Sequence, residues 1–221
     1  MSGWLALVGG AEFTAPCTFD RTLLERSGAH EVVILPTGAA YEHPQRLVDR
    51  GIEWFASLGA SARGLEVLTR PHALDPSMAD TVRAASFIYL AGGSPMHLRS
   101  VLVHSPVWDA IVEAWDGGAV VAGSVAGAQV LGDPMVDSRG GAFTLGLGLI
   151  SNVAVIPQHD RWSVDALHRT RVLSQAGMAL FGVDEATAAI RHPDGTWTAE
   201  GAGRVTLHVG GEAAELDGFC R

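Results

Sequence analysis

Short apolar runs alternate with segments of helical periodicity along most of this chain of 221 residues. Each apolar run spans only a few residues and is bounded by turn residues, which is typical of strands buried on both faces of a parallel sheet. The intervening segments place their apolar residues on one helical face. This alternation predicts an α/β protein, a three-layer sandwich in which helices cover both faces of a mostly parallel sheet.

The expected strands cover residues 4–8, 31–35, 63–68, 87–90, 119–122, 153–156 and 179–183. The expected helices cover residues 18–26, 44–58, 77–84, 96–102, 105–115, 126–131 and 164–175. Near the C-terminus, antiparallel strands are expected at residues 188–192, 197–200 and 204–208, where they extend the sheet at one edge around the turn at Asp194-Gly195. The length and the even pattern predict a single domain over residues 1–221.

Charge and cysteine content limit the classes of function that this chain can have. The formal net charge is -9 and all 15 basic residues are arginine, which argues against nucleic-acid partners and anionic membranes. Without lysine the chain cannot form a Schiff base. Cys17 and Cys220 match neither a disulfide framework nor a zinc-ligand spacing. We therefore expect a small-molecule or protein partner.

Membrane and secretory signals are not expected here either. The first ten residues predict a strand and not a secretory leader, and the longest uncharged run, residues 117–132, is shorter than the roughly 20 apolar residues of a membrane span. A cytoplasmic protein is the default expectation.

Several expected strands end in small residues, such as Gly9-Gly10, Ala91-Gly92-Gly93 and Gly123. Ligands in open α/β sheets bind at these carboxyl ends. The first strand-helix turn does not supply the G-x-G-x-x-G pattern, so a dinucleotide is not expected. Each of these glycines could be present only because it makes a tight turn. That explanation accounts less well for their gathering at one edge of the sheet.

The segment from Val120 to Ala128 has the outline of a nucleophile elbow, the sharp turn between a strand and a helix that exposes a reactive side chain. Val125 stands where the nucleophile belongs, and an alkyl group cannot attack a carbonyl. Elbow residues often have positive φ, which is strained for a β-branched side chain. Either the turn is relaxed or the strain is retained, and the sequence leaves both open.

Further segments carry a family pattern in the same order along nearly the whole chain: residues 4–10, 33–37, 89–93 with Leu98, 123–128, 145–149 with Gln158-His159, and 182–188. Together they resemble the cyanophycinase and aspartyl dipeptidase family of serine peptidases. The resemblance implies a glutamine-amidotransferase-like fold. It also implies a Ser-His-Glu triad that hydrolyses bonds adjacent to aspartyl residues without a metal or cofactor.

The family elbow reads G-T-S-A-G-A, so its serine falls on Val125 and Ser124 takes the preceding place. His159 matches the general base of the family. Glu185, with Asp184 as the second choice, matches the carboxylate that orients the base. Alternatively, His159 is a histidine with no functional role, and Glu185 is a solvated surface acid.

Oxyanion donors would be backbone N–H groups, expected from Gly93 and from Ala126 at the start of its helix. Gly92, Gln158 and Arg161 are candidate binding residues. Arginine suits carboxylate recognition, although Arg161 could equally lie on a solvated surface.

The resulting expectation is a pseudoenzyme that binds a small peptide, an amino acid or a partner protein without hydrolysing it. The alternative is an active serine-type hydrolase that uses Ser124 or a water activated by His159. Adjacent residues of an extended segment point to opposite sides, so Ser124 is expected to face away from His159 unless the elbow is slipped. A glutamine amidotransferase would need a cysteine at the elbow, and neither Cys17 nor Cys220 is there. A homodimer is left open.

Overall fold

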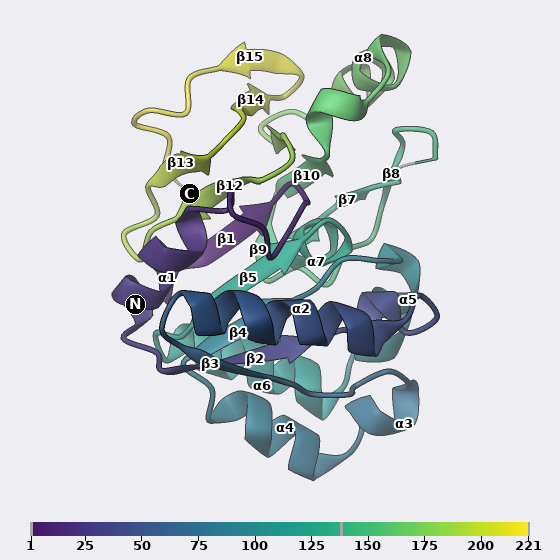
Figure 1. Cartoon of the computed structure of the whole chain (residues 1–221). Helices are drawn as coiled ribbons and strands as arrows, with labels where there is room; N and C mark the ends of the chain where they lie inside the picture. Colours follow the sequence, from purple (N-terminus) through teal and green to yellow (C-terminus); the bar gives the residue numbers. More distant parts are fainter. Residues whose placement is uncertain (1, 138, 221) are drawn as a thin grey trace.

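Two large sheets carry most strands in the computed structural model, which describes residues 2–137 and 139–220 (Figure 1). The first sheet has the order β13-β12-β1-β5-β4-β2-β3. In it β1, β5, β4, β2 and β3 are parallel, while β12 and β13 continue past β1 in antiparallel pairing. Its strands are β1 (Leu5–Val8), β2 (Glu31–Leu35), β3 (Ser61–Gly64), β4 (Phe87–Leu90), β5 (Val120–Ser124), β12 (Thr187–Arg191) and β13 (Trp197–Gly201).

The second sheet has the order β15-β14-β11-β10-β6-β9, with β10 and β11 parallel at its centre. Its strands are β6 (Gly132–Asp133), β9 (Ile150–Ser151), β10 (Val153–Pro157), β11 (Ala179–Val183), β14 (Val205–Val209) and β15 (Glu212–Ala214). A hairpin of β7 (Met135–Val136) and β8 (Phe143–Thr144) forms a separate small sheet.

The helices are α1 (Phe19–Ser27), α2 (Pro44–Ser57), α3 (Arg70–Ala73), α4 (Pro76–Arg83), α5 (Pro95–Leu102), α6 (Pro106–Asp116), α7 (Ala126–Leu131) and α8 (Val164–Val172), with 3-10 turns η1 (Thr37–Ala39) and η2 (His159–Arg161). Their starts follow local chemistry. Asp75, Ser94 and Ser105 cap α4, α5 and α6 by accepting a backbone N–H bond, and each helix then begins with proline, whose missing N–H costs nothing there.

Side chains of the first sheet alternate between two apolar clusters. Leu5 and Leu7 of β1 pack into the cluster under α4, α5, α6 and α7, whereas Ala6 and Val8 pack under α1 and α2. The same period of two holds along β2, β4 and β5. The predicted α/β class with helices on both faces of a mostly parallel sheet is therefore confirmed.

The prediction of one sheet is corrected. The strands expected at residues 153–156 and 179–183 belong to the second sheet. The C-terminal strands divide between both sheets, because β12 pairs with β1 and β13 with β12, while β14 pairs with β11. Apolar patterning reports that a strand is buried and does not name its neighbour.

Some boundaries also differ from the sequence prediction. The strand expected at 63–68 is β3, which ends at Gly64, and the helix expected at 164–175 ends at Val172. The expectation missed α3, β6, β7, β8, β9 and β15, each of four residues or fewer, because segments this short carry no measurable periodicity.

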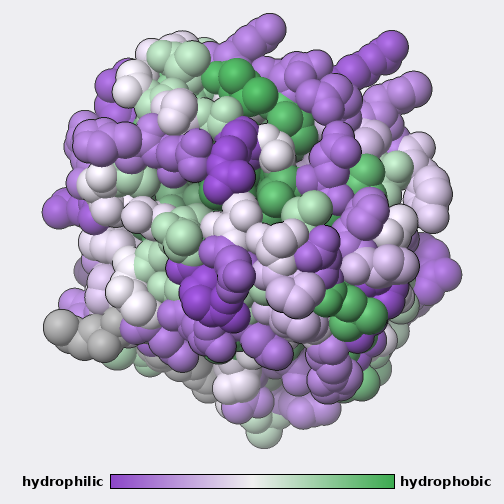
Figure 2. Space-filling view, turned by 90° about the horizontal axis from the view of Figure 1, so that it is seen from below, coloured by the Kyte–Doolittle hydropathy of each residue, from purple (hydrophilic) through white to green (hydrophobic). Residues whose placement is uncertain are grey.

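One face of the molecule, viewed from below in Figure 2, is covered mostly by hydrophilic side chains, with hydrophobic ones emerging in small patches. Within the described residues, every helix is too short or too polar to cross a bilayer.

Candidate active site

The elbow is formed where β5 ends at Ser124 and α7 begins at Ala126. Between them Val125 has φ 47° and ψ -101°, so the strained conformation is retained despite the β-branched side chain. The backbone holds it from both sides: the N–H of Val125 donates to the Val8 carbonyl at 3.1 Å, and the N–H of Gln129 donates to the Val125 carbonyl at 3.0 Å. Of the two conformations that the sequence left open, the structure has the strained one.

Gly127 explains why the elbow motif needs small residues. A Cβ atom on Gly127 would lie 2.2 Å from the Leu90 carbonyl oxygen of β4, far inside van der Waals contact. A Cβ atom on Gly123 would lie 2.5 Å from the carbonyl carbon of Gly127. The first turn of α7 thus sits directly on the sheet, and this places Val125 at the carboxyl end of β5.

Ser124 lies fully buried next to Val125, and its hydroxyl donates to Glu12 Oε2 at 2.9 Å. Glu12 is 9% exposed, and its Oε1 accepts the backbone N–H of Gly92 at 3.4 Å. This carboxylate links the loop after β1 to the elbow and to the glycines after β4. Glu12 was not among the residues predicted from the sequence, although an acid after the first strand, near its carboxyl end, was a usable signal.

A cavity of about 400 Å³ opens above Val125. Its lining includes Glu12, Gly92 and Gly93, so the structure brings both glycines and Val125 to one cavity. The rest of the lining comes from η1, the following turn and α2: Ala39, Glu42, His43, Arg46, Leu47 and Arg50.

His159 begins η2, just after β10. Its Nδ1 lies 3.4 Å from Asp184 Oδ1, and the two side chains are 20% and 19% exposed. Asp184 is fixed in turn because its Oδ2 accepts the backbone N–H of Arg204 at 2.9 Å and its own N–H donates to the Arg204 carbonyl. The carboxylate against His159 is therefore that of Asp184, the second choice of the sequence analysis.

Glu185, the first choice, has other partners. Its Oε1 accepts a hydrogen bond from Gln158 Nε2 at 2.7 Å, and its Oε2 lies 2.5 Å from Arg161 Nη2. Arg161 is 64% exposed and lies at this ion pair, outside the lining of the cavity above Val125. The expected pairing of Glu185 with His159 is wrong because β11 ends one residue before Asp184, which brings Asp184 and not Glu185 to the histidine.

Gln158 is the candidate that reaches the elbow from the second sheet. Its N–H donates to the Gly9 carbonyl at 2.8 Å. A Cβ atom on Gly10 would lie 3.2 Å from Val125 Cγ2 and 3.3 Å from Gln158 Cγ, so both side chains lie over Gly10. The ring of His159 lies instead over Gly182 of β11, where a Cβ atom would be 2.4 Å from its Cδ2.

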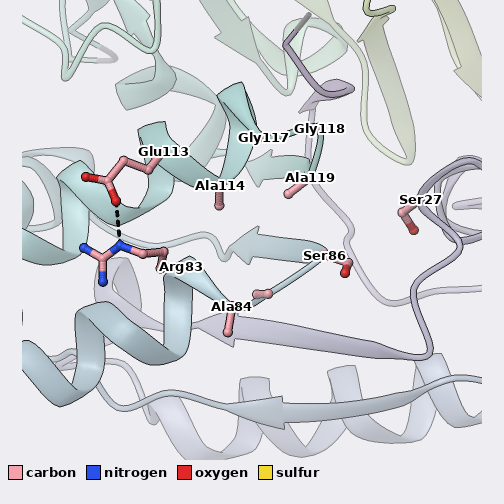
Figure 3. A pocket seen from close by; sticks show the side chains of 10 residues that line it. Ser27, Arg83, Ala84, Ser86, Glu113, Ala114, Gly117, Gly118 and Ala119 are labelled. Carbon is pink, nitrogen blue, oxygen red and sulfur yellow. Dashed lines mark hydrogen bonds and ion pairs between the residues drawn. The ribbon is translucent and has the colours of Figure 1, made fainter.

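A pocket at the opposite edge of the first sheet is shown in Figure 3. It lies beside Ser86 and Ala119, which directly precede β4 and β5, so it faces the amino ends of these strands. Its charged groups, Arg83 and Glu113, pair with each other. Ligand sites of α/β sheets lie at the carboxyl ends of the strands, which favours the elbow over this pocket as the ligand site. Among the described residues, three or more His, Cys, Asp or Glu side chains are nowhere grouped so that they could hold a metal ion.

The chain is similar in sequence to curated cyanophycinases. It is 30% identical over 199 residues to a cyanophycinase from Trichormus variabilis, a match that covers 85% of this chain and 66% of the relative. It is 25% identical over 219 residues to a cyanophycinase from Synechococcus elongatus, covering 93% of this chain and 67% of the relative. This chain thus spans about two thirds of the length of these relatives.

Solved structures give the same picture of the fold. A crystal structure of a peptidase from an acI-B1 Actinobacterium superposes with a TM-score of 0.82 at 30% identity, covering 95% of this chain and 91% of that one. A protein from Listeria monocytogenes assigned as peptidase E has a TM-score of 0.69 at 15% identity, covering 92% and 100%. The model of peptidase family S51 matches residues 5–196. The chain belongs to peptidase family S51.

Proposed function

We propose that this protein binds an acidic amino acid or a short aspartyl peptide above its elbow and does not hydrolyse it. The observation that carries the proposal is Val125, which occupies the elbow in the strained conformation of a nucleophile but offers only methyl groups. Acyl transfer to the protein needs a hydroxyl or thiol within reach of a base. The side chain at this position provides neither.

Ser124 does not supply the missing hydroxyl in this arrangement. It is fully buried, and it donates its hydrogen bond to Glu12. To act as nucleophile it would have to leave that carboxylate and move past the backbone of Val125. A second buried hydrogen bond would be lost if Glu12 moved with it, because Glu12 also accepts the N–H of Gly92.

The preference for an acidic ligand rests on the cavity above Val125. Arg46 and Arg50 line it from one face of α2, one helical turn apart. Guanidinium groups bind carboxylates through paired hydrogen bonds. Backbone N–H groups of Gly93 and Ala126 would add uncharged donors at the elbow. The relatives named cyanophycinase and peptidase are consistent with a peptide ligand, and this site would keep the binding half of such an activity.

One observation favours a second candidate, hydrolysis by a water molecule. His159 and Asp184 form a base–carboxylate pair at 3.4 Å, the arrangement that prepares an imidazole to accept a proton. In this case activity would be present without any nucleophile at residue 125.

The test compares wild type with Val125→Ser and Val125→Ala on aspartyl dipeptides and β-aspartyl-arginine, with binding measured by calorimetry. We expect wild type and Val125→Ala to bind without cleavage, and Val125→Ser to cleave at least about 100-fold above them. His159→Ala in the Val125→Ser background should abolish the gain.

Wild-type cleavage that disappears in His159→Ala would replace the proposal with the water mechanism. Wild-type cleavage that disappears instead in Ser124→Ala would assign the nucleophile to Ser124. A wild-type protein that binds none of these compounds would show that the ligand assignment is wrong.

A further inference from the structure

A second cavity, of about 240 Å³, lies on the outer face of the second sheet and shares no lining residue with the cavity above Val125. Residues of β10, β11, β14, η2 and α8 line it, and β10, β14 and α8 are labelled in the upper part of Figure 1. Its lining consists of Ile156, His159, Leu167, Arg171, Leu180, Gly182, Thr206 and His208.

The hollow follows from strand register. Gly182 of β11 stands opposite Ile156 of β10 and Thr206 of β14, so the three residues form one row across the sheet. In the next row, Leu180 stands opposite His208 on the same face. Because Gly182 has no side chain, the His159 ring and the Thr206 hydroxyl lie close over its backbone, where an added Cβ would be 2.4 and 2.5 Å from them. The cavity lies beside these groups, between the sheet and α8.

Helix α8 contributes Leu167 and Arg171, which are four residues apart and therefore share a helical face. The apolar part of the lining, called here the apolar wall, consists of Leu167 with Ile156 and Leu180 of the sheet. The polar part of the lining consists of the Thr206 hydroxyl and several nitrogen-bearing side chains.

Those side chains are all basic: His159, Arg171 and His208. Among the described residues, the Arg171 guanidinium has no carboxylate within ion-pair distance, and it only reaches the Gly211 carbonyl, at 3.4 Å. Burial and then the positive charges of Arg171 and His159 lower the pKa of His208 below its ordinary value. Mutual repulsion of this kind is what a bound anion would relieve.

Acidic groups near the cavity are already occupied or lie at its edge. Asp184 pairs with His159, while Glu212 of β15 acts on His208 only as a smaller opposing influence on its pKa. The neighbouring charges of η2 are turned elsewhere, because Asp160 accepts the N–H of Glu185 and Arg161 pairs with the Glu185 carboxylate. The polar side of the cavity is therefore positive when its histidines are protonated.

We infer that this cavity is a binding site for a small carboxylate with a short aliphatic chain. The carboxylate would contact Arg171, His208 and the Thr206 hydroxyl, and the chain would lie against Ile156, Leu167 and Leu180. The volume is below that of a typical drug-sized pocket, which limits the occupant to a few heavy atoms beyond the carboxylate. Such a ligand would also touch the His159 ring, so the site would communicate directly with the base–carboxylate pair.

The experiment titrates the wild-type protein with sodium butyrate and follows the histidine ring signals by NMR, with acetate and inorganic phosphate as comparison anions. We expect the His208 and His159 signals to shift saturably and the pKa of His208 to rise by about one unit, because a bound anion stabilises imidazolium. Butyrate should bind at least about tenfold more tightly than acetate or phosphate, since only butyrate uses the apolar wall.

Arg171→Gln should weaken butyrate binding at least about tenfold. Arg169→Gln is the matched control: Arg169 is also exposed and on α8, but it donates to the Gly140 carbonyl outside the cavity, so binding should be unchanged. Leu167→Ala should reduce the preference for butyrate over acetate.

Three results would overturn the inference: no saturable shift of either histidine, equal affinities of Arg171→Gln and Arg169→Gln, or phosphate binding as tightly as butyrate. None of these depends on whether the cavity above Val125 binds a peptide.

Discussion

Asp20 of helix α1 is fully buried, and its Oδ2 accepts a hydrogen bond from the indole N–H of Trp54 at 2.8 Å. Its Oδ1 has no hydrogen-bond partner among the described residues. Burial, with a smaller contribution from the nearby charge of Glu12, raises the pKa of Asp20 to about 7, against the downward effect of Trp54. The folded protein therefore holds this proton more tightly than the unfolded chain does.

This has a direct consequence for stability against pH. As pH rises from the unfolded pKa of 3.8 to the folded value of about 7, the unfolded chain loses the proton first, so the free energy of unfolding falls across that window. The total contribution is up to about 4 kcal/mol, and above the folded pKa the loss is complete. Asp20→Asn, which keeps an acceptor for Trp54, should remove this fall and be more stable than wild type at about pH 8.

Urea unfolding of both proteins at about pH 5 and about pH 8 measures the effect. Asp109→Asn, an exposed aspartate of α6, is the control and should leave the pH profile of wild type in place. A difference between wild type and Asp20→Asn that is the same at both pH values would contradict the assignment.

At the residue scale, the elbow lies where the sequence motif predicts it, between β5 and α7, but the neighbours of the elbow and of His159 could not be predicted. Val125 was identified from the motif alone. Glu12 was missed because its importance lies in contacts with Ser124 and Gly92, which are 112 and 80 residues away. Asp184 and Glu185 differ only in which one β11 presents to His159, and no pattern in the sequence records that.

Among the elements, β5 and α7 show how closely packed the site is. Because a Cβ atom on Gly127 would lie 2.2 Å from a backbone oxygen of β4, Gly127→Ala must push α7 away from the sheet. We expect a loss of more than about 3 kcal/mol in the free energy of unfolding, or a failure to fold.

Gly140→Ala is the matched control for Gly127→Ala. The nearest atom to its added Cβ is the flexible Arg169 Nη1 at 3.6 Å, so the change should stay within about 0.5 kcal/mol. Thermal unfolding followed by circular dichroism compares the two variants. Equal stability of both would mean that α7 does not rest on β4 as described.

Long, periodic elements were predicted best. Helix α2 and strand β2 were expected within one residue of their observed bounds. Helix α2 buries one face and begins with a proline, and β2 is a continuous apolar run that is buried on both faces of the sheet. Strand β3 was predicted too far along the chain, because Leu65, Val67 and Leu68 continue the apolar pattern. Pairing with β2 stops before them, at Gly64. Pairing depends on a partner strand, which apolar patterning does not reveal.

For the whole molecule, the two sheets share one core. Leu7 and Val121 of the first sheet belong to the same apolar cluster as Val155 and Phe181 of the second. The ring of Phe181 also lies 4.4 Å from that of Trp197 on β13, in the first sheet. We therefore expect the two sheets to unfold in a single transition, with far-UV and near-UV signals coincident.

Phe181→Ala should lower the midpoint seen by both signals equally, at a cost of about 3–5 kcal/mol. Leu173→Ala, at a residue that is 47% exposed, is the control and should cost much less. Two separated transitions in the wild type would show that the sheets are independent units.

The strained backbone at Val125 has a consequence for engineering. The turn is imposed by Gly127 on β4 and by the hydrogen bonds of Val8 and Gln129, so it does not depend on which side chain the residue carries. The backbone of the elbow therefore fixes the direction of the side chain at residue 125. A cysteine, a serine or a synthetic amino acid bearing a catalytic group, placed at this one codon, would be presented at the mouth of an existing cavity with its direction fixed in advance.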